Sequence, residues 1–213
     1  MTKTLWYKSK KGLTSGLVDG FQQSFSVDKR LAEEDIVGSI AYAQALKQAK
    51  VLSGRDAMII KKNLLKMRGQ IIPFISRPAL AGKKQFAVRN GAKAEDIHTA
   101  VEMELTKLAG KLAGKIHTGR SRNEQVVADE RLYLKKAVAG IQAGIHNLQQ
   151  EIVSQAQTHI KVMMPGYTHL QQAQPILFSY YLMSWFFALQ RDKERLGDCL
   201  DRIDASPYGS GAL

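Results

Sequence analysis

Apolar residues recur at helical spacing through much of the second half of the chain. From Asn123 an apolar residue falls every three, four or seven positions over about four heptads, a pattern typical of a helix packed along one seam. The seam residues are Val127, Leu134, Val138, Ile141, Ile145, Leu148 and Ile152. The spacing predicts one long helix from Asn123, with these side chains buried between helices.

Two further segments repeat this periodicity. The segment from Glu95 opens with two acids, which favour a helix N-terminus, and continues with one apolar face. That face consists of Ile97, Val101, Leu105, Leu108 and Leu112. A second long helix is predicted between Pro175 and Pro207. The stretch Met164–Pro175 interrupts the helices and is predicted as a short loop.

The pattern therefore predicts an all-α fold, a bundle of long helices in which strands are nearly absent. We divide it into an N-terminal helical domain, residues 1–110, and the start of a central long-helix bundle, residues 111–213. The seams need more partners than one chain supplies, so we expect a homo-oligomer. The final residues, SPYGSGAL, are typical of a turn that leads into a further element. We therefore expect the C-terminal part of the bundle to be absent from this chain.

Composition limits the class of protein. The 213 residues are 45% hydrophobic and 23% charged, as in globular proteins, which excludes disorder, collagen and a disulfide scaffold. Cys199 has no cysteine to pair with and indicates a reducing compartment, the cytoplasm. The N-terminus lacks an apolar signal region, and the longest apolar stretch, 177–189, is too short for a membrane span.

The net charge of +12 is concentrated in one region. Residues 57–94 contain nine basic residues and no acid. Phe74 and Phe86 are the aromatics beside them, and no RNA-binding or helix-turn-helix pattern is present. The segment favours a solvated or anion-attracting surface over a nucleic-acid site.

Two segments carry candidate chemistry. In Ile116–Gln125, IHTGRSRNEQ, two arginines precede a helix start, an arrangement that binds carboxylates. The alternative is an ordinary helix start with a Ser or Asn cap and solvated arginines. In the Met164–Pro175 loop, His169 lies beside hydroxyl and amide groups and is the best acid/base candidate, although a lone loop histidine is often structural. The histidines lack metal-ligand spacing, and no nucleotide-binding motif occurs, so no metal or cofactor is expected.

Five blocks in the same order resemble the argininosuccinate lyases of the fumarase and aspartase superfamily. Along the chain they are FQQSFSVDKRLAEEDIVGSIAYAQAL, AEDIHTAVEMELTKLAGKLAG, IHTGRSRNEQVVADERL, MPGYTHLQQAQP and SPYGSGAL. The resemblance implies a cofactor-independent, reversible β-elimination of argininosuccinate to arginine and fumarate. It also implies a homotetramer around a central helical bundle, with each site built from several subunits.

By position, the resemblance makes His169 the acid/base histidine. The residues it places at the substrate are Ser24, Asp96, His98, Arg122, Asn123 and Thr168. The chain departs from the family at Glu124, where Asp is usual, and at Gln172, where Arg is usual. It also lacks the GSSxMPxKxNP loop with the family's catalytic serine and substrate-binding lysine.

Three functions therefore remain open. The first is half of a lyase that is inactive alone. The second is a non-catalytic helical structural protein of the same family, as in the related lens crystallins. The third is a basic RNA-binding module.

Overall fold

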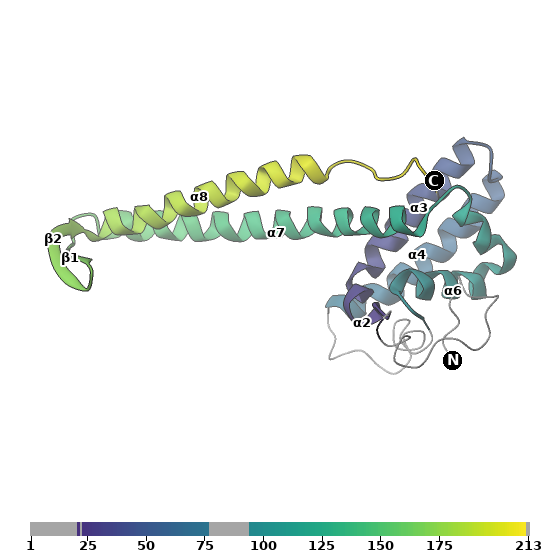
Figure 1. Ribbon diagram of the computed structural model, residues 1–213, viewed down its shortest axis with the longest axis horizontal. Coiled ribbons are helices and arrows are strands. Elements are labelled where there is room, and N and C mark those ends of the chain that lie inside the picture. The colour runs from purple at the N-terminus through teal and green to yellow at the C-terminus, as the bar shows by residue number, and fades with distance from the viewer. Residues whose placement is uncertain (1–20, 22, 77–93, 212–213) are drawn as a thin grey trace. The chain divides into compact units, whose positions relative to one another are not determined.

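The computed structural model describes residue 21 and residues 23–76 and 94–211 (Figure 1). These residues form two compact units. The first comprises the described residues up to Tyr133 together with Ser206–Gly211, and the second is Leu134–Ala205. Both are built mainly of helices, which confirms the predicted helical-bundle class. The domain boundary predicted at 110/111 falls within the first unit, inside the 3-10 helix Gly110–His117.

The first unit is a cluster of helices around one apolar core. Its elements are α2 (Phe25–Asp28), η1 (Lys29–Leu31), α3 (Ala32–Gln48), α4 (Gly54–Ser76), α6 (Ile97–Ala109), η3 (Gly110–His117) and the start of α7 (Arg122–Thr158). Fully buried Ile36, Ile60 and Ile97 bring α3, α4 and α6 together in that core. The basic stretch 57–94 begins within α4, and residues 77–93 lie outside the described structure.

The helix predicted from Glu95 is confirmed as α6. Ile97, Val101 and Leu105 are buried along the expected face. The α-helix ends at Ala109, before the predicted apolar face does, and the chain continues as η3. Gly110 follows with a φ of +60°, a conformation that glycine adopts without a side-chain clash.

The second unit pairs two long antiparallel helices, α7 and α8 (Phe178–Ile203), as Figure 1 shows. Gln142 Nε2 donates to the Lys193 carbonyl at 3.3 Å, and seven residues later Gln149 Nε2 donates to the Phe186 carbonyl at 3.3 Å. This spacing is that of one continuous seam. The helix predicted from Asn123 is confirmed, starting one residue earlier.

The predicted burial of the α7 seam is wrong for most of its residues. Val138 is buried and Ile145 half-buried, whereas Leu134, Ile141 and Leu148 are 41%, 52% and 49% exposed. Val127, in the first unit, is also exposed. Within the second unit, α8 packs against one flank of the seam. The other flank stays exposed because one partner helix cannot cover both flanks.

The predicted loop Met164–Pro175 lies instead in an antiparallel hairpin. Strand β1 (Met163–Thr168) pairs with β2 (Gln171–Leu177), with Pro165 opposite Pro175. Each strand of a two-stranded ribbon has an outer edge, where a proline removes no ladder hydrogen bond. The register shifts between Pro165 and Tyr167, at Gly166. Prolines and a glycine therefore do not exclude strands here.

No helix in the described ranges is long and apolar enough to cross a bilayer.

Candidate active site

The segment Ile116–Gln125 forms a capped helix start. Ser121 Oγ accepts the Asn123 N–H at 3.2 Å, and the Glu124 carboxylate accepts the Ser121 N–H at 3.1 Å. This is a reciprocal capping arrangement, in which a serine and a glutamate three residues later satisfy N–H groups that the helix leaves unpaired. Capping and anion binding are compatible here, because the positive end of the helix dipole still lies at Arg122 and Asn123.

Arg122 is held by neighbouring side chains. Its Nη1 donates to Gln125 Oε1 at 2.9 Å, its Nη2 lies 3.2 Å from Glu102 Oε2, and its Nε lies 3.9 Å from Asp96 Oδ2. The side chain is 13% exposed. Arg122 is therefore not a freely solvated arginine: its guanidinium is oriented, and two carboxylates offset its charge.

Glu102 links this arginine to a histidine. His117 Nε2 lies 3.0 Å from Glu102 Oε2. Burial by itself would raise the pKa of Glu102, but His117 and Arg122 outweigh it and lower that pKa. Sequence reasoning missed both residues, since a lone acid and a lone histidine gave no spacing signal.

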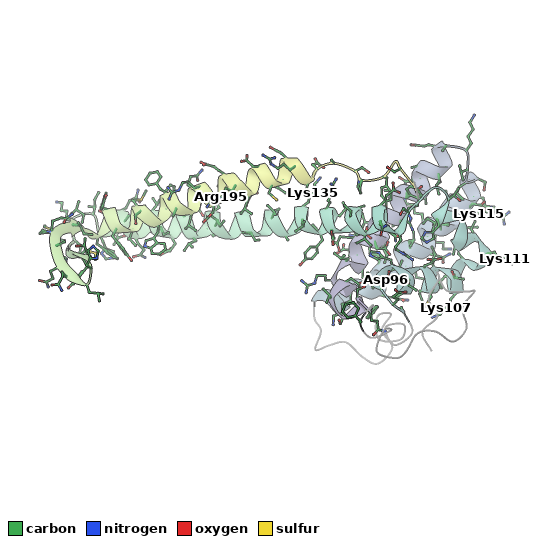
Figure 2. All side chains as sticks on the ribbon, viewed as in Figure 1. Asp96, Lys107, Lys111, Lys115, Lys135 and Arg195 are labelled. Atoms are coloured by element: carbon green, nitrogen blue, oxygen red, sulfur yellow. The ribbon has the colours of Figure 1, made fainter. Side chains whose placement is uncertain are left out.

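Ser24 and Asp96 meet at the start of α6. Asp96, labelled in Figure 2, precedes the first residue of α6. Its side chain caps the helix by accepting the Thr99 N–H at 2.6 Å. Ser24 Oγ donates to Asp28 at 2.6 Å, and Asp28 accepts the Ile97 N–H at 3.1 Å. The fold thus brings Ser24, Asp96 and Arg122, separated by up to 98 residues in sequence, into one neighbourhood.

His98 is buried inside the first unit. Its side chain is 1% exposed, and its Nδ1 lies 3.2 Å from Asp129 Oδ2 and 3.6 Å from Asp35 Oδ1. Gln125 Nε2 also donates to Asp35. Asp35 lies on α3, His98 on α6 and Asp129 on α7, so a buried charge cluster joins three helices. His98 is thus a buried member of this cluster, and its expected place at the substrate stays a prediction.

The charges in this cluster favour a protonated imidazole. Burial opposes the positive charge on His98, but Asp129 and Asp35 outweigh it and raise its pKa to about 10. Burial and the neighbouring Asp35 raise the pKa of Asp129 to about 7. The ligand atoms of these three residues lie within 4.8 Å of one another, so they are also the described residues best placed to hold a cation. A protonated His98 already supplies the positive charge.

A sequence signal for this cluster existed. Asp35 interrupts the buried stripe of α3 between Ala32 and Ser39, and all three side chains are buried. An acid on the apolar face of a helix is expected to have a charged partner. Its partners, 63 and 94 residues away in sequence, could not be identified from that stripe.

Thr168 and His169 belong to the second unit. They lie at the end of β1 and in the two-residue turn of the hairpin. His169 and Leu170 have φ values of +50° and +62°, and their side chains are exposed. Hairpin turns of this kind normally use asparagine and glycine, because other residues are strained at positive φ. Strain of this kind is concentrated at functional positions. The predicted site residues are therefore divided between two units, with Ser24, Asp96, His98, Arg122 and Asn123 in the first.

A family profile described as lyase matches residues 9–213. The chain belongs to this lyase family, in the fumarase and aspartase superfamily. Among its curated relatives, the argininosuccinate lyase of Desulfatibacillum aliphaticivorans is 42% identical over 94% of this chain and 40% of that protein. The argininosuccinate lyase of Geobacillus sp. (strain WCH70) is 43% identical over 99% of this chain and 43% of that protein. The resemblance inferred from the five sequence blocks is confirmed. This lyase-family chain spans about two fifths of the length of these relatives.

Solved structures show that the fold is shared. A fumarate lyase from Mesorhizobium sp. BNC1 matches with a TM-score of 0.65 at 19% identity, covering 81% of this chain and 38% of that one. A 3-carboxy-cis,cis-muconate lactonizing enzyme from Pseudomonas putida matches with a TM-score of 0.65 at 19% identity, covering 93% of this chain and 44% of that one. Both comparisons show that the chain shares their helical fold.

Proposed function

We propose that the protein is an argininosuccinate lyase of arginine biosynthesis, cleaving argininosuccinate reversibly to arginine and fumarate without a cofactor in the cytoplasm. The observation that supports this best is the 42–43% identity, over nearly the whole chain, to argininosuccinate lyases of several bacteria. The similarity includes both segments selected for their chemistry, because the aligned regions cover 94–99% of the chain.

The side chains suit the reaction. Elimination needs a base to remove a proton beside a carboxylate, donors for the resulting dianion, and an acid for the leaving guanidino nitrogen. We assign the acid/base role to His169. Arg122 and Asn123, at the positive end of α7, suit the binding of substrate carboxylates. Ser24, Asp96 and Thr168 supply further hydroxyl and carboxylate contacts.

We further propose that sites form between copies in a homotetramer. The exposed seam residues Leu134, Ile141 and Leu148 provide an apolar flank that another helix can cover. Because the 213 residues lack the family's serine and lysine loop, we expect the chain by itself to have no useful turnover. Adding a separately expressed chain with that loop should restore fumarate release.

The test measures fumarate release from argininosuccinate by ultraviolet absorbance, using the complemented protein. His169→Asn should lower turnover roughly 10²- to 10⁴-fold if the imidazole transfers a proton. Arg122→Lys should raise KM, since a point charge cannot replace a two-pronged contact. His146→Asn, at an exposed position on α7, is the control. Unchanged turnover in His169→Asn would remove that histidine from the mechanism, and a complemented protein without lyase activity would favour the structural alternative.

A further inference from the structure

The Glu124 carboxylate joins two segments that are more than eighty residues apart in sequence. One of its oxygens, Oε2, accepts the Ser121 N–H at the start of α7. The other, Oε1, accepts three consecutive backbone N–H groups, those of Gly209 at 3.0 Å, Ser210 at 2.9 Å and Gly211 at 2.9 Å. Successive N–H groups that converge on one anion form a nest.

Other features of the 206–211 segment agree with a fixed position. The rings of Tyr208 and Tyr42 lie 5.2 Å apart, and Tyr42 donates its hydroxyl to the Thr118 carbonyl at 2.9 Å. Gly211 has a φ of +63°, which a residue with a side chain adopts only with strain. The Ser121 N–H, followed by those of the nest, lowers the pKa of Glu124, so this residue is a carboxylate at neutral pH.

We propose that Glu124 is a positioning residue that fastens residues 209–211 to the start of α7 and thereby fixes the orientation of Arg122 and Asn123. This inference rests on the proposed function, which places those two residues at the substrate. The glutamate itself touches no substrate in this proposal. Its four N–H donors occupy the carboxylate, and its effect on catalysis is exerted through the backbone next to Arg122.

Amide hydrogen exchange and NMR of the 213-residue chain test the attachment directly. Glu124→Gln keeps the shape of the side chain but replaces one acceptor oxygen with a donor NH₂ group, which cannot accept the Ser121 N–H or the nest. We expect exchange at Gly209, Ser210 and Gly211 to rise at least about tenfold, because charge-assisted bonds are roughly twice as strong as neutral ones. The backbone resonances of Arg122 and Asn123 should shift. Glu130→Gln, at an exposed glutamate on the same helix, should change neither.

A second variant covers failure of Glu124→Gln to fold. Gly211→Ala disturbs the nest from its own side, at a positive φ, and leaves Glu124 and Ser121 unchanged. It should shift the Arg122 and Asn123 resonances as Glu124→Gln does. Exchange within twofold of the wild type in both variants, or unshifted resonances at Arg122 and Asn123, would overturn the proposal.

Kinetics of the complemented enzyme separate positioning from simple structural support. Loss of folded protein lowers apparent kcat and leaves KM unchanged, whereas misplaced binding groups raise KM. We expect KM for argininosuccinate to rise about tenfold in Glu124→Gln, and an unchanged KM would contradict a positioning role. A wild-type protein without lyase activity would refute the proposed function, while the exchange and resonance measurements would still decide whether Glu124 makes the attachment.

Discussion

Replacing His98 with Gln should strongly destabilise the first unit. The change removes the only imidazole between Asp35 and Asp129, whose side chains are each 1% exposed. A buried carboxylate that loses its positive partner is penalised by desolvation, typically by about 3–5 kcal/mol. The glutamine side chain can donate a hydrogen bond but carries no charge to offset two buried acids.

The raised pKa of His98 expresses the same interaction as a proton affinity. A rise from 6.5 to about 10 means that the folded protein binds this proton more tightly than the unfolded chain does. At pH 7 this preference corresponds to about 4 kcal/mol of stability, taking 1.36 kcal/mol per pKa unit.

The sign of the pH dependence follows from the same proton. The stabilisation by His98 is complete below pH 6.5, the ordinary value, and is lost as the pH rises through about 10. The raised pKa of Asp129, from 3.8 to about 7, acts in the same direction at lower pH, since its ionisation is also disfavoured in the folded state. The free energy of unfolding of the wild type should therefore fall between pH 6.5 and 10.

The assay is urea unfolding followed by near-ultraviolet circular dichroism, which responds to the packed tyrosine rings of the first unit, Tyr42 and Tyr208. His146→Gln, at an exposed position, should stay within about 0.5 kcal/mol of the wild type. Adding Asp129→Asn to His98→Gln removes one uncompensated acid and should recover roughly 1–2 kcal/mol. An unchanged free energy of unfolding in His98→Gln, or no recovery in the double variant, would refute a charged buried cluster.

Three smaller changes test local features of the fold. Asp96→Ala should lower the free energy of unfolding by about 1 kcal/mol through loss of the α6 cap, and Asp96→Asn by less, because it keeps a capping oxygen. Ile141→Asp should change the thermal midpoint of the isolated chain little, since Ile141 is 52% exposed. A thermal midpoint lowered by the equivalent of several kcal/mol of unfolding free energy would show instead that the seam is buried in solution. Leu170→Gly should stabilise the hairpin by about 1 kcal/mol in urea unfolding, because Leu170 is 96% exposed at a φ of +62°, and destabilisation would contradict strain there.

Local sequence determined where the helices lie. The start of α7 at Arg122 followed from the change to heptad spacing, and the start of α6 from the acids that precede Ile97. These signals lie within one or two turns of the residues they affect, so the chain alone reveals them. The five family blocks likewise carried the lyase assignment, because they are patterns along the sequence.

Tertiary structure decided which of these residues face one another. Periodicity defined the α7 seam but not its covered flank, because burial depends on how many helices pack against it, and α8 covers one side. The hairpin had no sequence signal, since His169 and Leu170 occupy turn positions that usually take asparagine and glycine. Asp35, His98 and Asp129 come from three helices. Glu124 accepts the N–H of Gly209, which lies 85 residues later in the sequence. A local pattern records that a residue is buried or charged, whereas the identity of its distant partner is settled only when the helices pack.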